Sequence, residues 1–561
     1  MIDIEIKSKK NGALTSLSKE TGKKFIEISF ANYSVKLIYN ENLPIMHFEN
    51  HDFFIFSKSI PKISIDALIQ VAEKIYTLLD KTSFEYTGQY FFFVIDKKEG
   101  RAYIFRDAWG TTPIYYSKID DFTFIFSDSI TNFNKYKKGI NFNASSLSEY
   151  ITCSYVCAPV TVFEDIYTFC PRQMGDFNFS TFHLNQVENI KFPTINNLSF
   201  DSVVSSLDKL LKVSLKNIID CYQSDFKYYL SLSGGNDSSL LAAMIKEICP
   251  SLNLMAGCVD YENWHNNDTE FFHYVADKLK LSKHLESINN QNYADGLVNL
   301  IKSTSNIYHT FSPAFTNLCD SLSKLSDRKF SVHLNGTGPD ECMVGFEKLS
   351  VQELLSLNKV PKSEWVDKLI GSLDYFYTID QTIQDLFLEK VEYKSYRKML
   401  ANRAAENAVD FVDFQRKYAF ETITDHHIKM IYDITRSHNQ MTYMPFCTQE
   451  IFNLTFSTPF TVLNGQSKTK LIIKELLKKY FTEDFILRKK IGFHAPSRVY
   501  FKELNVGMNK LITNIEPELM SKYYKTDIVK REINTRLNST EAPMDYFLWT
   551  TVNTYLLNNN L

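Results

Sequence analysis

The sequence predicts a two-domain α/β protein, in which an antiparallel, β-rich α+β layer domain precedes a doubly wound parallel sheet with a helical C-terminal part. Three observations support this prediction. The chain has 561 residues, which is too long for one ordinary domain. Short strands broken by turns fill residues 1–185, whereas strands alternate with helices between 228 and 335. Beyond residue 350 the periodic runs are helical and rich in charge.

The N-terminal domain, residues 1–185, is expected to be built from antiparallel strands and one helix. A run with helical spacing at 65–80 follows Ser64, which is a suitable N-cap. Residues 186–205 are polar, contain a proline and are predicted as a linker. The predicted strands are 25–30, 34–38, 53–56, 90–95, 102–105 and 122–126.

The second domain is expected at 206–500, with 501–561 as its C-terminal helical extension. A helix at 201–222 leads into a strand that begins at 228. Strands that alternate with helices form parallel sheets, and ligands bind at the carboxyl ends of such strands. The later predicted elements are strands at 252–259, 283–288 and 330–335, a helix at 268–279, and two helices before the last strand.

Composition excludes several classes of protein. The chain is 44% hydrophobic and 23% charged, which is typical of a globular protein, and its net charge is −3 without a long block of either sign. We therefore expect no nucleic-acid partner. Nine scattered cysteines without CxxC pairs indicate reduced thiols. No signal core or stretch of about 18 apolar residues occurs, so we expect a cytoplasmic protein without membrane contact.

The strand that begins at 228 runs into the loop SGGNDSS at 233–239, which is suited to a polyphosphate. Glycines lack a Cβ, so their backbone N–H groups can approach an anion, and the helix that opens near Asp237 directs its positive end to the same place. Serine hydroxyls can donate hydrogen bonds, and Asp237 is a hard oxygen ligand for Mg²⁺. No lysine follows the glycines, so this is not the GxxxxGK[ST] loop.

The SGGNDSS loop resembles the pyrophosphate-binding SGGxDSS loop of the N-type ATP pyrophosphatases, which cleave ATP between the α and β phosphates. This resemblance implies ATP as the nucleotide. The expected ATP and pyrophosphate ligands in this loop are Ser233, Gly234, Gly235, Asn236, Asp237, Ser238 and Ser239.

The strand at 330–335 leads into Gly336-Thr-Gly-Pro-Asp-Glu341, which resembles the "SGEG.DE" loop of asparagine synthetases. The resemblance assigns Asp340 as the second metal-binding aspartate and adds Gly336 and Gly338 to the nucleotide loops. Asp237 and Asp340 would follow two parallel strands and could hold Mg²⁺ on the β and γ oxygens of ATP. ATP and Mg²⁺ are therefore the expected cofactors.

Three later segments extend the resemblance to asparagine synthetases over about 205–500. Residues 444–446, 465–471 and 488–496 resemble the "R.PFLD", "G..K..L..A" and "RRPK.GF..P" landmarks. On this basis Lys490 occupies the position of the lysine that stabilises charge on the α-phosphate and on the later tetrahedral intermediate. The neighbouring Lys489 is the alternative.

The N-terminal domain resembles the class II glutamine amidotransferase domain of the same enzymes, which has the Ntn amidotransferase-like fold. The segments 88–96, 104–116 and 126–128 carry this resemblance. Glutamine hydrolysis in that domain needs an N-terminal cysteine whose own α-amine acts as the base. Residue 2 is isoleucine and the first cysteine is Cys153. We therefore interpret the domain as a degenerate glutaminase with a structural role.

The acceptor half of the site departs from the asparagine synthetase pattern. Thr337 replaces the glutamate of "GEG", and a hydroxyl has no useful basicity near neutral pH. The segment before Met444 has lost the Glu and Arg of "E.R.PF". The candidate catalytic set is Lys490, Thr337 and Tyr443, and the candidates for the group that accepts the amine proton are Tyr443, His333 and His494.

These observations predict an ATP-dependent amide ligase that adenylates a carboxylate, releases pyrophosphate and joins the acyl group to an amine without hydrolysing glutamine. As in β-lactam synthetases and lasso-peptide cyclases, the product would be a specialised metabolite or peptide. The expected partners are a small-molecule or peptide carboxylate, an amine, and a precursor peptide or carrier; the residues leave a homodimer open. The alternatives are an ammonia-dependent asparagine synthetase, an enzyme of transfer-RNA sulfur transfer or lysidine formation, and a non-catalytic scaffold.

Overall fold

The structure of the protein is a computed structural model. It covers residues 1–8, 23–77, 86–136, 141–222, 226–262, 264, 268–343, 351–374, 385–391, 395–465, 469–488, 495–539 and 546–560. Among these residues no helix is both long and apolar enough to cross a membrane.

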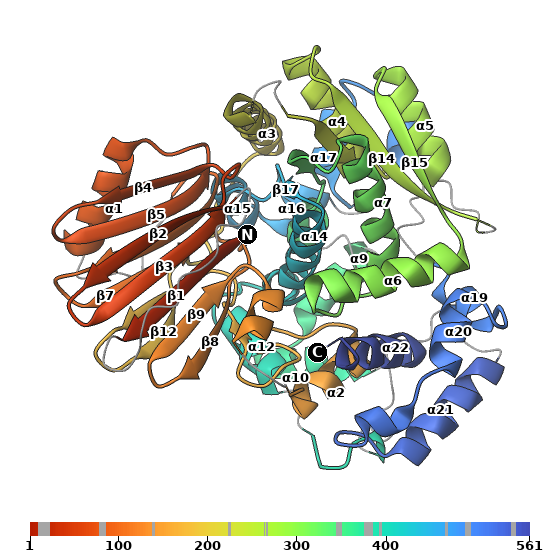
Figure 1. Ribbon diagram of the computed structural model, residues 1–561. Helices are drawn as coiled ribbons and strands as arrows, with labels where there is room; N and C mark the ends of the chain where they lie inside the picture. The colour runs from red at the N-terminus through yellow and green to blue at the C-terminus, as the bar shows by residue number, and fades with distance from the viewer. Residues whose placement is uncertain are drawn as a thin grey trace.

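The N-terminal domain consists of two six-stranded antiparallel sheets that face each other (Figure 1). The first sheet has the order β10-β8-β9-β1-β3-β2, with β1 (Ile2–Ser8), β2 (Lys23–Phe30), β3 (Tyr33–Asn40), β8 (Tyr115–Asp120), β9 (Thr123–Ser127) and β10 (Tyr167–Thr168). The second has the order β12-β11-β7-β6-β5-β4, with β4 (Ile45–Glu49), β5 (Phe53–Ile60), β6 (Gln89–Asp96), β7 (Arg101–Arg106), β11 (Gln173–Asn178) and β12 (His183–Glu188).

The six predicted strands of this domain are confirmed, and six further strands complete the sheets. The helix α1 (Ile65–Thr77) begins as predicted, because the Ser64 hydroxyl accepts the Ala67 N–H at 3.2 Å. β12 extends to Glu188 and the next helix begins at Phe200, so the irregular connection between them covers 189–199.

The central strands β5 and β6 of the second sheet are buried on both faces, which explains their phenylalanine-rich sequences. In β6 the side chains of Phe91 and Phe93 pack in the core between the two sheets. The alternate side chains of Phe92 and Val94 pack on the opposite face, in the cluster that includes Leu68 of α1. Because both faces are apolar, β6 has a continuous hydrophobic sequence rather than an alternating one.

The second domain contains a five-stranded parallel sheet with the order β15-β14-β13-β16-β17. The predicted strands are confirmed, and the strand adjacent to β16 is an addition that the sequence did not indicate. The strands are β13 (Tyr228–Ser231), β14 (Leu254–Tyr261), β15 (Ser282–Ile288), β16 (Ser331–Leu334) and β17 (Gln440–Tyr443). The doubly wound arrangement places the carboxyl ends of β13 and β16 side by side.

Helices surround this sheet and continue to the C-terminal region (Figure 1). A π-helical turn, Phe420–Thr424, joins α13 directly to α14. Besides α1, the described α-helices before residue 380 are α2 (Ala144–Cys153), α3 (Phe200–Tyr222), α4 (Asn236–Ile248), α5 (Asp268–Lys278), α6 (Asn290–Thr304), α7 (Ser312–Leu325), α8 (Pro339–Met343), α9 (Val351–Ser356) and α10 (Trp365–Asp374). The later ones are α12 (Ser395–Glu406), α13 (Phe411–Ala419), α14 (Asp425–Ser437), α15 (Gln449–Ser457), α16 (Phe460–Asn464), α17 (Leu471–Leu477), α18 (Glu483–Leu487), α19 (Ser497–Lys502), α20 (Gly507–Thr513), α21 (Thr526–Asn538) and α22 (Tyr546–Asn558).

The two domains share a buried, hydrogen-bonded interface. Trp109, which is fully buried, donates its indole N–H to the Thr448 carbonyl at 3.1 Å. Gln89 donates to the Met444 carbonyl at 2.6 Å, just after β17. The N-terminal domain therefore packs directly against the segment that leads from β17 to α15.

Candidate active site

The two glycine-containing loops meet at the carboxyl ends of β13 and β16. These strands are parallel neighbours, with Leu230 opposite Leu334. A Cβ placed on Gly336 would lie 3.2 Å from the Ser238 nitrogen. The close approach of the two loops therefore depends on the missing side chain at position 336.

The SGGNDSS loop forms a tight turn whose backbone favours glycine at position 234. Gly234 has φ of +67°, and a Cβ there would lie 2.6 Å from Cβ of Phe271. The Gly235 N–H donates to the Ser233 hydroxyl at 3.2 Å, and the Ser238 hydroxyl donates to the Gly235 carbonyl at 3.3 Å. α4 begins at Asn236, so the first N–H groups of the helix lie within the motif.

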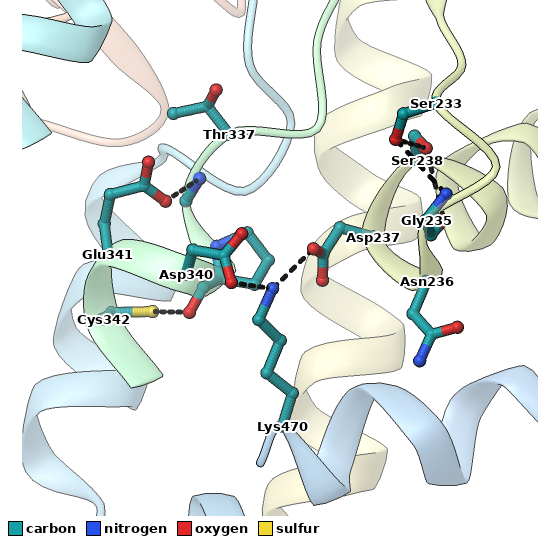
Figure 2. Close-up of polar contacts among 12 residues, drawn as sticks. Ser233, Gly235, Asn236, Asp237, Ser238, Thr337, Asp340, Glu341, Cys342 and Lys470 are labelled. Carbon is teal, nitrogen blue, oxygen red and sulfur yellow. Dashed lines mark hydrogen bonds and ion pairs between the residues drawn. The ribbon is translucent and has the colours of Figure 1, made fainter. Parts of the chain in front are cut away.

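A lysine links the two aspartates that the sequence assigned to metal. The Nζ atom of Lys470 lies 2.6 Å from Oδ2 of Asp237 and also forms an ion pair with Oδ1 of Asp340 (Figure 2). All three side chains are largely buried. Burial alone would lower the pKa of Lys470, but the two carboxylates outweigh it and raise that pKa above its ordinary value.

This geometry fits a cation held by two carboxylates. Asp237 and Asp340 both reach one ammonium group, so both could reach one small metal ion. Among the described residues no group of three or more His, Cys, Asp or Glu side chains is arranged to hold a metal. Mg²⁺ commonly takes one or two protein carboxylates and completes its shell with phosphate oxygens and water, so the pair suits nucleotide-bound Mg²⁺ better than an all-protein site.

The sequence did not assign a role to Lys470. It belongs to the segment 465–471, which carried one of the family landmarks, but a lysine in a polar stretch is usually a solvated surface residue. Its backbone N–H donates to Asn464 Oδ1 at 2.6 Å, and it immediately precedes α17. That local arrangement helps to direct the side chain into the site, and no periodicity in the sequence reveals it.

The loop after β16 also contains Thr337 and Gly338, and Glu341 follows in α8. The Thr337 hydroxyl donates to Asn335 Oδ1 at 2.8 Å, so it stabilises the turn. Gly338 has φ of +131°, and its N–H donates to Oε2 of Glu341 at 2.8 Å. Figure 2 shows Thr337 and Glu341 on the same side of this loop. The structure places Thr337 beside the site, but not as a base.

Two of the candidate proton acceptors lie inside the protein core. Tyr443 is fully buried on β17, and its hydroxyl is 2.9 Å from the Ser214 hydroxyl on α3; burial raises its pKa. His333 is fully buried on β16 and lies 2.7 Å from both Ser231 and Gln440; burial lowers its pKa to about 4. Proton acceptance from a substrate does not fit either position. The corrected role of both side chains is packing within the sheet.

Lys490, Lys489 and His494 lie outside the described residues. The chain approaches that segment through Arg488, whose guanidinium donates to the Gly234 carbonyl and, at 3.1 Å, to Oδ1 of Asn236. The same guanidinium stacks 3.6 Å from the ring centroid of Phe485. Arg488, the first residue of the segment 488–496, therefore connects that segment to the SGGNDSS loop by hydrogen bonds.

Family comparison supports the motifs independently. The sequence model of the asparagine synthase family matches residues 207–553, which is more than half of the chain. The chain belongs to the asparagine synthase family. A second match, to the glutamine amidotransferase domain, covers residues 71–187. The family assignment agrees with the resemblance found in the loops after β13 and β16.

The curated relatives are distant. The chain is 23% identical over 477 residues to asparagine synthetase [glutamine-hydrolyzing] 1 of Bacillus subtilis, covering 78% of this chain and 72% of the relative. It is 24% identical over 303 residues to the protein of Methanocaldococcus jannaschii named "Putative asparagine synthetase [glutamine-hydrolyzing] 2", covering 52% of this chain and 56% of that relative. The match thus spans just over half the length of this second relative.

Solved structures give only weak overall likeness. The glutamine-dependent NAD⁺ synthetase of Acinetobacter baumannii matches with 18% identity and a TM-score of 0.21, covering 33% of each chain. The NH₃-dependent NAD synthetase of Campylobacter jejuni matches with 17% identity and a TM-score of 0.20, covering 32% of this chain and 86% of that one. At these TM-scores the likeness has no bearing on function.

Proposed function

We propose that the chain is an ATP-dependent amide ligase. It adenylates a substrate carboxylate, releases pyrophosphate and transfers the acyl group to an amine, with AMP as the second product. The observation that carries this proposal is the convergence of Asp237 and Asp340, from loops after two neighbouring parallel strands, on the single cation of Lys470. Membership of the asparagine synthase family supports the same chemistry.

Each part of the site has a task in the first half-reaction. The backbone at Gly234 and Gly235 and the start of α4 bind the phosphates of ATP. Asp237 and Asp340 hold Mg²⁺, which when bound neutralises phosphate charge. Lys470 neutralises the two carboxylates of this site when no metal is bound. Lys490 stays a prediction for the lysine that stabilises charge on the α-phosphate.

The acceptor half supports a substrate other than aspartate with ammonia. Thr337 stands at the position of the glutamate in the "GEG" landmark, and its hydroxyl is engaged by Asn335. The match to the glutamine amidotransferase domain begins at residue 71 and leaves the first strands unmatched. These observations support a ligase of specialised metabolite or peptide biosynthesis that does not hydrolyse glutamine.

Asparagine formation from aspartate and ammonia is the second candidate, because the relative from Bacillus subtilis is named as an asparagine synthetase. Both candidate functions begin with adenylation of a carboxylate by ATP, and they differ in which carboxylic acid is the substrate. The acid specificity of adenylation therefore separates them.

The test is exchange of radiolabelled pyrophosphate into ATP with Mg²⁺, using a panel of aspartate, β-amino acids and peptides. We expect exchange that depends on one acid class and that is abolished in Asp237→Ala and Asp340→Ala. An exposed aspartate of the N-terminal domain, Asp52→Ala, is the matched control. Activity with aspartate alone would favour the second candidate. No exchange together with no ATP binding would refute ligase function.

A further inference from the structure

The side chain of Asn236, the central residue of the SGGNDSS loop, is bound by the end of α18. Its Nδ2 donates to the Ile486 carbonyl at 3.2 Å, and its Oδ1 accepts a hydrogen bond from Arg488 at 3.1 Å. Figure 2 shows the amide of Asn236 pointing away from the hydroxyls of Ser233 and Ser238. The side chain of Asn236 therefore ties the loop to α18 rather than facing the serine side of the loop.

Arg488 follows α18 and holds the same loop through its guanidinium. Besides Asn236, it donates to the carbonyl of Gly234. The guanidinium also packs against two aromatic rings, with its central carbon 4.4 Å from the ring centroid of Phe271 and 3.6 Å from that of Phe485. Stacking of this kind orients a planar guanidinium, whereas the flexible ammonium of a lysine has no plane to stack. Arg488 is therefore a rigid donor beneath the loop.

The hydrogen bond to Gly234 sets the direction of a backbone N–H in the loop. A trans peptide unit is planar, so its C=O and its N–H point in opposite directions. The carbonyl of Gly234 and the N–H of Gly235 belong to one such unit; the carbonyl accepts from Arg488, and the N–H points to the Ser233 hydroxyl at 3.2 Å. Because glycine is conformationally free, and Gly234 has φ of +67°, this unit needs support from outside the loop to keep its orientation.

We propose that Asn236 and Arg488 are positioning residues, which hold the SGGNDSS loop in its phosphate-binding conformation before ATP arrives. The inference rests on the proposed function, because that function places the phosphates of ATP on this loop. Arg488 orients the peptide unit between Gly234 and Gly235, and Asn236 ties the first residue of α4 to the end of α18. A loop that is already ordered loses less conformational freedom when its ligand binds, so the affinity for ATP is higher.

The experiment measures binding, catalysis and stability separately in Asn236→Leu, Arg488→Met and the double variant. Calorimetry with a non-hydrolysable ATP analogue and Mg²⁺ gives the dissociation constant without any chemical step. Acid-dependent pyrophosphate exchange gives KM for ATP and kcat, and urea unfolding gives the stability of each variant. Asn534→Leu and Arg531→Met, both at exposed positions of α21, are the matched controls.

We expect Arg488→Met to weaken binding of the analogue and to raise KM for ATP by about tenfold, and Asn236→Leu to do so by at least about threefold. The value of kcat should change by less than about threefold, because an ordered loop binds substrate and transition state alike. The double variant should lose less than the product of the two single effects, since both side chains act through one contact. Arg488→Lys should bind the analogue nearly as weakly as Arg488→Met, because a lysine lacks the paired donors and the stacking.

Unchanged affinity for the analogue in Arg488→Met would overturn the assignment. Lower stability in urea with wild-type affinity would also overturn it, because the two side chains would then have only a structural role. Independent effects in the double variant, or full affinity in Arg488→Lys, would show that the contact between Asn236 and Arg488 does not act as a unit and would overturn it as well.

The proposed function fails in a different way. A wild-type protein that binds the analogue but catalyses no exchange would remove the ligase function and not the positioning role, which calorimetry would still decide. A wild-type protein that does not bind the analogue would overturn both.

Discussion

Lys470→Met should destabilise the protein in magnesium-free buffer by about 3 kcal/mol. Methionine keeps much of the volume of the lysine stem but removes the charge that both carboxylates share. The side chains of Lys470 and Asp237 are 9% and 11% exposed, so both are buried partners. Loss of one partner of a buried ion pair costs about 3–5 kcal/mol, and we expect the lower end because Asp340 is 22% exposed and keeps some hydration.

The assay is urea unfolding of wild type and variant, with and without Mg²⁺ and a non-hydrolysable ATP analogue. Because a metal between the two carboxylates would replace the missing ammonium, Mg²⁺ with the analogue should stabilise Lys470→Met more than wild type. Adding Asp340→Asn to the variant should recover part of the lost stability, since one of the two uncompensated charges is then gone.

Two outcomes would refute this interpretation. Stability within about 0.5 kcal/mol of wild type in magnesium-free buffer would mean that Lys470 does not neutralise the pair. Equal stabilisation of both proteins by Mg²⁺ with the analogue would mean that the metal does not bind between Asp237 and Asp340.

Three further predictions follow from the placement of single residues. Gly234→Ala should weaken ATP binding more than tenfold in calorimetry, because φ is +67° and the new Cβ would lie 2.6 Å from Phe271. Tyr443→Phe should change pyrophosphate exchange by less than about threefold and stability by about 1 kcal/mol, because its hydroxyl bonds Ser214 in the core. Burial lowers the pKa of His333 from 6.5 in the unfolded chain to about 4 in the folded protein. The free energy of unfolding should therefore fall by up to about 3 kcal/mol as the pH drops from 6.5 to 4, because only the unfolded chain binds the proton readily. In urea unfolding experiments, His333→Gln should reduce this pH dependence.

The elements and the two nucleotide loops could be predicted because their signals are local. Period-two and period-3.6 patterns mark strands and helices within a few residues, and Gly234 and Gly336 are needed by the backbone at their own positions. β17 was not predicted, because its local signal is weak. β17 has only four residues, Gln440–Tyr443, and is buried at every position, so it shows no alternation that distinguishes it from a core helix.

The sequence by itself determined the two-domain order and the parallel sheet, since strand, loop and helix signals lie next to one another in the chain. The resemblance to asparagine synthetases paired Asp237 with Asp340. Only the tertiary structure decided which side chains join that pair. Lys470 lies 233 residues from Asp237 in sequence and reaches it through the turn before α17. His427 opposes Glu341 from another helix, whereas Tyr443 and His333 point into the core. Contacts of this kind depend on strand order and on the direction of each side chain, which no local pattern encodes.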